Sequence, residues 1–424
     1  MARKLLIIIL LIVSLNSMSA QSNGAGHKTV LQNLNIINVI DGTVENNMDI
    51  VIDGEKIFDI VIHRTDWNNM DVQLIDLSGR YAIPGLIEGH SHISGVPENS
   101  LTLALKNGVT SIRDMGGDGK YLKELKDAVY SGELFAPDIY FSAMMGGPEL
   151  ILDDKRVKLS TPPSYSLGQA PWMRLVEDTS NIEKIIHEAK ACGATGIKLY
   201  SYLSPDLCIR LSREAKRQNL KVWAHASVYP TTVEETISGD VDVISHVTFL
   251  LLKDNWDMKK DGSLQLDSTR LSSEKLKNIF KVMKEKNIKL DPTLSVFQWQ
   301  IRTIIDDLQA NELRRLVFSC VKVAFDYGIK ISAGTDCPLP RKNDDRLMLH
   351  REIEMLVENV GLAPIDALQA STINNAEVIG IGKTHGSIEV GKYADMVILN
   401  DNPLLDIRSI ENVKMVIKKG KIIQ

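Results

Sequence analysis

Residues 82–93 read Ala-Ile-Pro-Gly-Leu-Ile-Glu-Gly-His-Ser-His-Ile, an apolar run that ends in His-x-His. In a β-strand, residues i and i+2 point to the same side. His90 and His92 therefore project together from the end of one predicted strand. Two neutral imidazoles on one side of a strand are typical of metal ligation, although isolated histidines have many other roles. The rest of the chain decides between a metal site and two ordinary histidines.

Eight short apolar runs in the middle of the chain indicate a barrel. Each run is followed by a polar or glycine-rich segment and then by a helical pattern. The runs span residues 85–89, 109–113, 138–143, 196–200, 221–226, 241–247, 288–294 and 329–334. This alternation predicts an α/β fold, a (β/α)8 TIM barrel. A doubly wound open sheet is the alternative, but it usually has a glycine-rich phosphate loop where this chain has His-x-His.

Ionisable residues recur where the predicted strands end. In a (β/α)8 barrel the chemistry lies at the C-terminal ends of the strands. The residues at these ends are His90 and His92 just after run one, Lys198 in run four, His225 in run five, His246 in run six and Asp336 after run eight. Each lies in an apolar context, where an unpaired polar group is costly. Together they predict one shared site, whereas any one of them alone would more simply be a satisfied buried group.

The two ends of the chain differ from its middle. Residues 27–83 and 386–424 show short β patterns with turn signals, and we expect them to form one composite β-sandwich beside a metal-binding barrel over residues 84–385. Residues 1–20 have basic residues, then an apolar run and then small residues, which predicts a signal peptide and a periplasmic or secreted protein. An N-terminal membrane anchor is the alternative, but the run is short for a span.

Composition excludes some kinds of partner. The formal net charge is −5 and there is no long basic run, so neither nucleic acid nor an anionic membrane surface is an expected partner. Cys192, Cys208, Cys320 and Cys337 lack the spacing of a disulfide framework, and we expect small buried thiols. No stable membrane anchor is expected on the mature chain, and a homo-oligomer is compatible with its composition.

Three stretches resemble the amidohydrolase superfamily. Pro-Gly-Leu-Ile-Glu-Gly-His-Ser-His at 84–92 is similar to the first-strand signature of its imidazolonepropionase-like and prolidase-like members. Gly-Ser-Ile-Glu-Val-Gly-Lys-Tyr-Ala-Asp-Met-Val at 386–397 and Leu34-x-x-x-Asn38 near the start also resemble that family. The resemblance covers nearly the whole mature chain, and it implies a metal-dependent hydrolase with a TIM barrel and a small β-sandwich.

The resemblance also implies a ligand set. By resemblance to the binuclear amidohydrolases, His90, His92 and Asp336 would hold one divalent metal, and His225 and His246 would hold a second. Lys198 would bridge the two metals. Because an ammonium would repel cations, the bridge requires a CO2-derived carbamate on Lys198, which forms from the neutral amine. An ammonium that binds substrate or water beside a single metal is the alternative. Zinc suits these ligands, and manganese, iron or cobalt also fit.

The chemistry implied is hydrolysis by a metal-bridging hydroxide, because bound cations acidify water and stabilise an oxyanion. Asp336 would accept the hydroxide proton and deliver it to the leaving nitrogen. Deaminase relatives carry a glutamate three residues after the strand-five histidine, where this chain has Val228. We therefore expect an enzyme that cleaves an amide bond in a small molecule or dipeptide. The alternatives are an esterase, lactonase or phosphotriesterase-like hydrolase with the same site, and a non-catalytic metal-bound binding protein.

Loops after the strands carry substrate specificity in barrels. Segment 144–179 is the longest, and it either contributes to the site, for example as a lid, or makes solvent or subunit contacts. The candidate substrate-binding residues are Tyr200, Trp299, Arg341 and His350, which follow predicted strands four, seven and eight.

Overall fold

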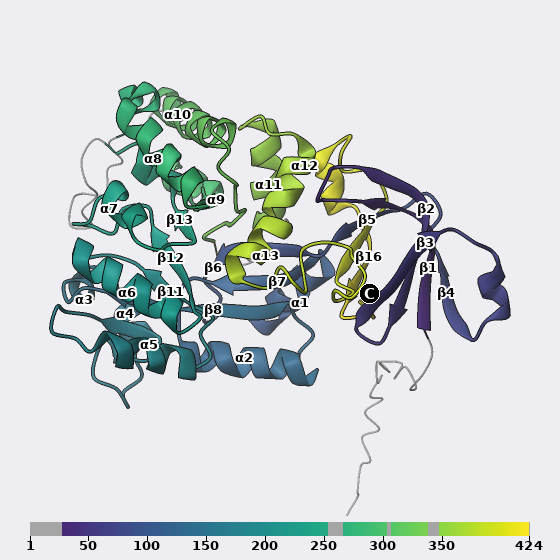
Figure 1. The fold of residues 1–424 in the computed structure, drawn as a ribbon, viewed down its shortest axis with the longest axis horizontal. Coiled ribbons are helices and arrows are strands. Elements are labelled where there is room, and N and C mark those ends of the chain that lie inside the picture. Colours follow the sequence, from purple (N-terminus) through teal and green to yellow (C-terminus); the bar gives the residue numbers. More distant parts are fainter. Residues whose placement is uncertain (1–27, 253–265, 303–306, 338–346, 424) are drawn as a thin grey trace, which may run out of the picture.

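The computed structural model describes residues 28–252, 266–302, 307–337 and 347–423. Figure 1 shows a barrel of strands surrounded by helices, with a second sheet beside it that contains both ends of the described chain. The predicted signal peptide over residues 1–20 and the candidate residue Arg341 lie outside the described residues.

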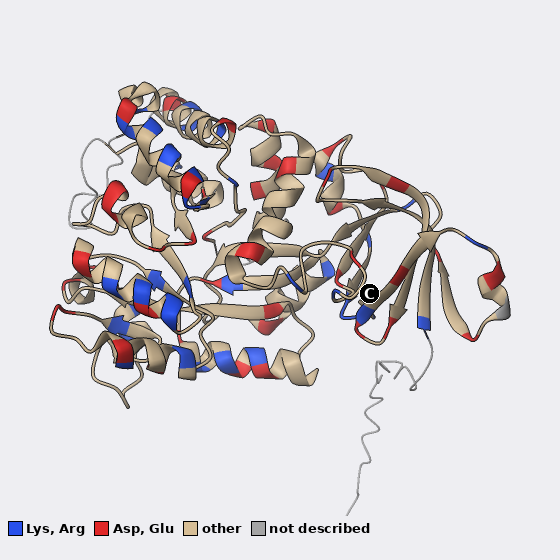
Figure 2. Cartoon of the chain, in the orientation of Figure 1, with Lys and Arg blue, Asp and Glu red and all other residues tan. Residues whose placement is uncertain are grey.

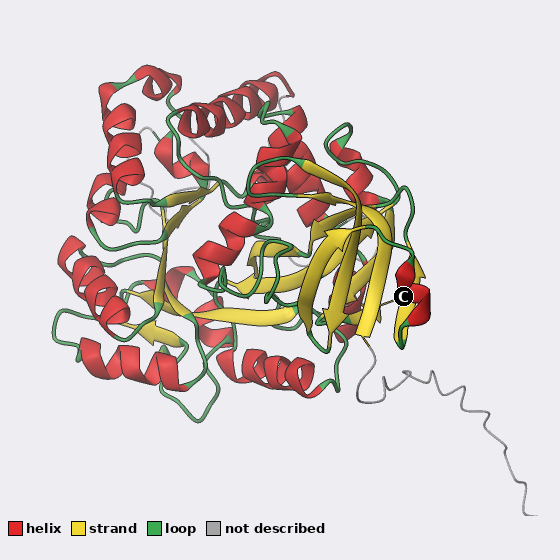
Figure 3. Cartoon of the chain, turned by 45° about the vertical axis from the view of Figure 1, so that its right-hand side comes forward, coloured by secondary structure: helices red, strands yellow, loops and turns green. Residues whose placement is uncertain are grey.

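The second sheet is assembled from both ends of the chain, as the sequence colours of Figure 1 show, and Figure 3 presents this sheet from another side. Its strands are β1 (Lys28–Ile37), β2 (Val44–Asp53), β3 (Lys56–Ile62), β4 (Val72–Asp76), β5 (Tyr81–Pro84), β15 (Met396–Leu399), β16 (Val413–Lys418) and β17 (Lys421–Ile423). They pair in the order β17-β16-β15-β5-β1-β2-β3, and β4 pairs with β1. The two ends of the chain meet where β5 and β15 run antiparallel, with Pro84 opposite Met396.

A branch and a tight turn shape this sheet. The first half of β1 pairs with β4 and its second half pairs with β5, so the eight strands form one branched sheet. The turn between β2 and β3 is the expected hairpin, because Asp53 lies opposite Lys56 and only two residues connect them. Gly54 has a φ of 57°, a conformation that glycine adopts without steric cost.

Seven parallel strands make most of the barrel wall, which confirms the predicted fold class. They are β6 (Leu86–Ser91), β7 (Val109–Asp114), β8 (Asp138–Gly146), β11 (Gly196–Leu199), β12 (Lys221–His225), β13 (Val243–Ser245) and β14 (Lys289–Asp291). Each pairs in parallel with the next in this order. Apart from Asp138 and Tyr140 in β8 and Lys221 in β12, which are half-buried, all of their residues are buried, as in sheets covered by helices on the outside.

The eighth predicted run closes the barrel without forming a regular strand. Segment 329–334 makes a single parallel bridge, between Ile331 and Leu290 of β14. On its other side the amide of Gly89 in β6 donates to the carbonyl of Ala333 at 3.0 Å. Asp336 follows in a left-handed conformation with a φ of 50°, so the chain turns here to bring that side chain over the barrel.

Helices cover the outside of the barrel. They are α1 (Glu98–Lys106), α2 (Gly119–Ser131), α3 (Leu150–Asp153), α4 (Arg156–Leu159), α5 (Ile182–Ala191), α6 (Pro205–Arg217), α7 (Val233–Ser238), α8 (Glu274–Glu285), α9 (Leu294–Ile301), α10 (Asp307–Asp326), α11 (Met348–Glu358), α12 (Pro364–Ala370) and α13 (Ile373–Ile379). Short 3-10 turns are η1 (Asp66–Asn69), η2 (Val247–Leu250), η3 (Ser268–Ser272) and η4 (Ile407–Glu411).

Local sequence explains why these helices begin and pack where they do. In α6 the Ser204 hydroxyl accepts from the amide of Leu207, and Pro205 occupies the first turn, where its missing N–H costs nothing. Leu207 and Leu211, four residues apart, are both buried. Burying each leucine contributes about 1.5–3 kcal/mol.

Segment 144–179 is folded rather than irregular. It contains the end of β8, the short helices α3 and α4, and the strands β9 (Gln169–Ala170) and β10 (Met173–Leu175). Strand β10 returns to lie parallel to β8, with Met173 opposite Met144. Trp172 packs in a small core with Leu150 and Val157, so this excursion has its own apolar support.

The remaining sequence expectations concern cysteines and charge. All four cysteines are free, and three of them are buried, as expected. Figure 2 shows acidic and basic residues interspersed along the helices. Within the described ranges, no helix combines the length and apolarity that a membrane crossing requires.

Candidate metal centre

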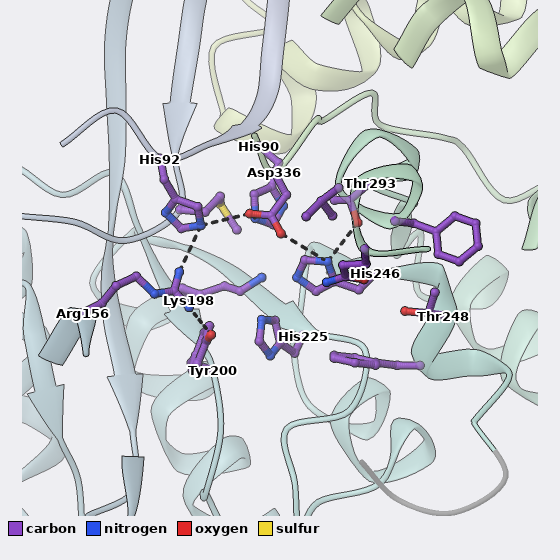
Figure 4. Close-up of a pocket in the computed structure, with 15 residues that line it drawn as sticks. His90, His92, Arg156, Lys198, Tyr200, His225, His246, Thr248, Thr293 and Asp336 are labelled. Atoms are coloured by element: carbon purple, nitrogen blue, oxygen red, sulfur yellow. Dashed lines mark hydrogen bonds and ion pairs between the residues drawn. The ribbon is translucent and has the colours of Figure 1, made fainter. Parts of the chain in front are cut away.

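The six ionisable residues predicted from the strand ends line one pocket of about 140 Å³ (Figure 4). The barrel elements bring together residues that the chain separates by up to 246 positions. His90 lies near the end of β6 and His92 just after it, Lys198 lies in β11, His225 ends β12, His246 follows β13, and Asp336 follows the segment that closes the barrel. The pocket is small, which favours a small-molecule ligand.

One group of ligands surrounds the Asp336 carboxylate. Its Oδ1 lies 3.1 Å from Nε2 of His92 and 3.5 Å from Nε2 of His90, and its Oδ2 lies 3.8 Å from Nδ1 of His246. One ligand atom from each of His90, His246 and Asp336 can be chosen so that all three lie within 4.8 Å of one another. Such a cluster of imidazole and carboxylate atoms fits a divalent cation.

The second pair of imidazoles lies beside the first group. The rings of His225 and His246 have centroids 4.7 Å apart, and the rings of His90 and His246 are 5.2 Å apart. Phe249 packs against both His225 and His246, at 5.4 and 5.5 Å. This contact fixes the two imidazoles from the apolar side of the pocket.

Lys198 is the residue whose chemistry is hardest to explain without a bound group. Its side chain is 1% exposed, and its Nζ has no hydrogen-bond partner among the described residues. Burial lowers the pKa of the amine, although the carboxylates of Asp291 and Asp336 oppose that shift. A buried amine that is easily deprotonated is the form that reacts with CO2.

The protonation states of the other residues also suit metal binding. Burial lowers the pKa of His246 to about 3, and it lowers the pKa values of His90 and His225 well below their ordinary range. Burial would raise the pKa of Asp336, but the neighbouring histidines, His90 first, hold it below its ordinary value. Neutral imidazoles beside an ionised carboxylate are the forms that bind cations.

A second layer of residues orients these ligands. The Nδ1 of His90 donates to Oδ2 of Asp291 at 2.7 Å, and the Nδ1 of His92 donates to the carbonyl of Gly116 at 3.0 Å. The Nδ1 of His246 shares a 2.9 Å hydrogen bond with the Thr293 hydroxyl. The first two bonds leave Nε2 of each ring facing the pocket, an orientation characteristic of metal-binding histidines.

Asp291 is itself held by a buried network. Besides His90, its Oδ2 accepts from the Ser245 hydroxyl at 3.0 Å, and it lies 3.4 Å from Nη2 of Arg113. Both Asp291 and Arg113 are fully buried. Sequence reasoning did not single out Asp291, although it ends β14 and so carried the same strand-end signal as the others.

The backbone is strained beside the pocket. His246, Thr293 and Asp336 have φ values of 72°, 51° and 50°. Side chains other than glycine rarely adopt this region, and such conformations cluster at functional sites. The amide of His246 donates to the carbonyl of Asp291 at 2.9 Å, and the amide of Asp336 donates to the carbonyl of His90 at 2.8 Å, so neighbouring barrel strands hold this backbone in place.

Sequence analysis also missed Arg156, which begins α4 in segment 144–179. Its Nη1 donates to Nε2 of His92 at 3.2 Å, and its Nη2 bonds the Tyr200 hydroxyl. Asp154 holds the same guanidinium, with Nε and Nη2 at 2.9 and 2.6 Å from its Oδ2. Apolar periodicity gives no indication that a loop arginine reaches a barrel centre.

The candidate substrate-binding residues fall in different places. Tyr200 lines the pocket, with its ring centroid 4.2 Å from that of His225. Trp299 is 47% exposed and is not among the lining residues, whereas Phe297 and Gln300 of the same helix are. His350 is buried in α11, where its Nε2 lies 3.0 Å from the carbonyl of Asn107 and outside the pocket.

The comparison with known families agrees with the resemblance found in the sequence. The pattern of the amidohydrolase family matches residues 81–423, which is more than half of the chain. The chain therefore belongs to the amidohydrolase family. Members of this family are hydrolases that generally bind divalent metal ions.

Individual relatives are distant. Ochratoxinase from Aspergillus niger is 24% identical over 357 residues, which cover 75% of this chain and 66% of that protein, just under two thirds of its length. A probable imidazolonepropionase from Nematostella vectensis is 23% identical over 418 residues, covering 91% of this chain and 92% of that protein. A crystal structure of a Xaa-Pro dipeptidase with bound methionine in the active site has a TM-score of 0.73 at 22% identity, covering 94% of this chain and 100% of that one. This likeness shows the shared fold.

Proposed function

We propose that this protein is a metal-dependent amidohydrolase that cleaves the amide C–N bond of a small molecule or dipeptide. The observation that carries the proposal is the convergence on one small pocket of four imidazoles, one carboxylate and one buried lysine, whose Nζ has no hydrogen-bond partner among the described residues. The names of the similar proteins, an ochratoxinase, a probable imidazolonepropionase and a Xaa-Pro dipeptidase, support this proposal. Deamination is disfavoured, because Val228 occupies the position where deaminase relatives carry a glutamate.

The residues present fit two divalent cations. His90, His92 and Asp336 would hold one, and His225 and His246 would hold the other. Lys198 would lie between them as a carbamate, because its buried Nζ, which no described residue hydrogen-bonds, otherwise remains a costly polar group. Zinc is the expected metal, with manganese, iron or cobalt as alternatives. When bound, such cations supply an acidified water and polarise a carbonyl.

The chain's own residues then do three things. The pocket wall keeps the substrate's amide near the ligand cluster and excludes bulk water. Asp336, ionised and 18% exposed, takes a proton from the attacking water and gives it to the leaving nitrogen. Asp291 and Gly116 fix the orientation of the histidine rings, so that little reorganisation is needed during the reaction.

The test combines metal content with a substrate panel. The purified chain is analysed for bound metals and assayed on dipeptides, N-acyl amino acids and matched esters. We expect close to two metals per chain and higher kcat/KM for amides than for esters of the same acid. Replacement of His225 by alanine should remove both metal and activity, whereas His187→Ala, at an exposed helix position, should change neither.

The result also separates the alternatives. Hydrolysis of esters, lactones or phosphotriesters in place of amides would assign the same centre to that chemistry. Tight ligand binding without any turnover by the metal-loaded protein would identify a binding protein instead. We also propose export of the mature chain, because residues 1–20 have the composition of a signal peptide.

A further inference from the structure

Helix α9 begins with a residue whose side chain does not cap it. Thr293 occupies the N-cap position, where a threonine hydroxyl usually accepts from an amide of the first turn. Here its hydroxyl caps none of the described amides, and its φ is 51°. The hydroxyl instead lies 2.9 Å from Nδ1 of His246, as the dashed line in Figure 4 shows. Thr293 therefore uses its side chain for the imidazole rather than for the helix.

A carboxylate from a distant helix caps α9 in its place. Glu352 of α11 is fully buried, and its Oε1 accepts from the amide of Leu294 at 2.8 Å. Its Oε2 accepts from the amide of Ser295 at 2.7 Å and from the hydroxyl of the same residue at 2.6 Å. The first amides of a helix have no partner within the helix, and the helix dipole favours a negative charge at this end. Glu352 thus does for α9 what an N-cap side chain does in other helices.

The first turn of α9 connects Glu352 to the pocket. The amide of Leu294 that Glu352 binds belongs to the peptide unit that joins Leu294 to Thr293. Both Thr293 and Val296, on the same turn, line the pocket. A displacement at Glu352 would therefore be passed directly to the hydroxyl that contacts His246.

The choice of a buried glutamate needs a reason. A threonine at the N-cap position can cap a helix without a buried charge, and a carboxylate is costly to remove from water even where it is hydrogen-bonded. The arrangement is explained if the Thr293 hydroxyl is required elsewhere, at His246. The carboxylate of Glu352 then replaces a cap that Thr293 has given up.

We propose that Glu352 is a positioning residue for the metal centre, which caps α9 and so leaves the Thr293 hydroxyl free to orient His246. This inference rests on the proposed function, because it takes His246 to be a ligand of the second cation. The bond to Thr293 fixes the rotation of the imidazole and the nitrogen that carries its proton. Without the cap the hydroxyl can turn back to the helix, and His246 becomes a poorer ligand. A ligand that another group orients, such as His90 on Asp291, keeps its geometry.

Zinc affinity provides the first test. Titration of the full chain with zinc against a chelator gives one dissociation constant for each proposed metal. Glu352→Gln keeps the shape of the side chain but places an NH2 group against donors, so that one amide of α9 loses its acceptor. We expect one zinc to bind about 10–100-fold more weakly, the range typical of residues that orient ligands, and the other to change by less than about threefold. Glu358→Gln, at the exposed end of the same helix beside Arg408, should change neither. Wild-type affinity for both metals in folded Glu352→Gln would overturn the proposal.

A double-mutant cycle shows whether Glu352 acts through Thr293. Thr293→Val removes the hydroxyl and keeps the shape, so it should weaken binding of the same zinc, whereas Thr293→Ser keeps the hydroxyl and should largely retain that affinity. In the Thr293→Val background, Glu352→Gln should have little further effect on zinc binding, because the contact it supports is already absent. Full additivity of the two losses would mean that Glu352 supports α9 without using Thr293, and it would refute the inference.

Folding and ring orientation are read without metal. Urea unfolding of the zinc-free protein shows whether Glu352→Gln is intact; if it is not, Ser295→Ala, which removes one of the three hydrogen bonds to Glu352, takes its place in the same cycle with a smaller expected loss. In zinc-free protein labelled with 15N-histidine, the signals that His246→Gln lacks should report one tautomer in the wild type and a mixture in Glu352→Gln. A wild-type chain that binds no zinc contradicts the proposed function, whereas unchanged His246 signals in Glu352→Gln contradict this inference alone.

Discussion

Replacement of Asp291 by asparagine tests whether the second layer of residues determines metal affinity. The Oδ2 of Asp291 accepts from Nδ1 of His90 at 2.7 Å, and both side chains are at most 2% exposed. An amide oxygen would accept this bond with less charge, and an amide nitrogen would force His90 into the tautomer that has its proton on Nε2. Either outcome makes His90 a poorer ligand.

The expected loss of metal affinity follows from that contact. Loss of such a partner typically costs 10–100-fold in metal affinity, about 1.4–2.8 kcal/mol. The substitution also leaves Arg113 without its buried counterion, and loss of one partner of a buried pair costs about 3–5 kcal/mol. We expect the loss of folding stability to lie at the lower end of that range, because an amide oxygen can still accept a hydrogen bond from Arg113.

The assay separates the two effects. Zinc dissociation constants come from competition with a chelator, and stability comes from urea unfolding of the metal-free protein. The matched control is Asp127→Asn, at an exposed pair with Lys123 on α2. The double variant Arg113→Met/Asp291→Asn should recover stability but not zinc affinity. A zinc dissociation constant within about twofold of wild type in folded Asp291→Asn would refute the reasoning.

Four further predictions concern the centre and the chain end. Lys198→Ala should lose metal and the carbamate signal that 13C-labelled CO2 gives in NMR spectra of the wild type; unchanged metal stoichiometry would exclude a bridge. Asp336→Asn should retain much of its metal and lose about 10²–10⁴-fold in turnover, and a near-normal rate would remove its role as proton shuttle. Because burial lowers the pKa of His246 to about 3, the unfolded chain binds a proton between pH 6.5 and 3 that the native chain does not. The metal-free protein should therefore lose up to about 1.4 kcal/mol of stability per pH unit from this residue as pH falls through that window, and pH-independent urea midpoints would contradict this. Finally, the proposed export predicts that mass spectrometry of the protein expressed in cells finds an N-terminus near residue 21, whereas an intact leader in the cytoplasmic fraction would disprove export.

The barrel and its ligand candidates were accessible from sequence because they obey local rules. A buried parallel strand is a short apolar run, and its end is where the first ionisable residue appears, as at His225 and His246. Once the runs are in order, topology alone brings these ends together. The same rule applies at Tyr200, which lies two residues beyond Lys198 and therefore faces the same pocket.

The eighth run shows where local rules weaken. Residues 329–334 are apolar enough to predict a strand, yet only Ile331 makes a bridge. The chain must leave the ladder early, because Gly334 lies against the backbone of His90 and Asp336 needs a φ of 50°. The contact of Gly334 with His90 and the backbone conformation of Asp336 thus favour a turn over a regular strand at this point of the barrel.

Helical periodicity explains why Trp299 does not line the pocket. Segment 294–301 follows strand seven as helix α9, in which Phe297 and Ile301 are four residues apart and both buried. Trp299 lies two residues from Phe297, on a different face of the helix, and is 47% exposed. Its aromatic character suggested a role in the site, but the helical phase assigns that place to Phe297.

Arg156 could not be found in the same way, because no local pattern marks its place in the pocket. Its position depends on the path of segment 144–179, which is supported by the packing of Trp172 and by the return of β10 onto β8. Those contacts are non-local, and no strand end or periodic face marks the arginine. The candidate metal ligands come from the barrel wall, whereas Arg156 comes from an excursion that returns to pair with β8 of that wall. Arg156→Gln should therefore leave zinc affinity close to that of the wild type, whereas Asp291→Asn should lower it.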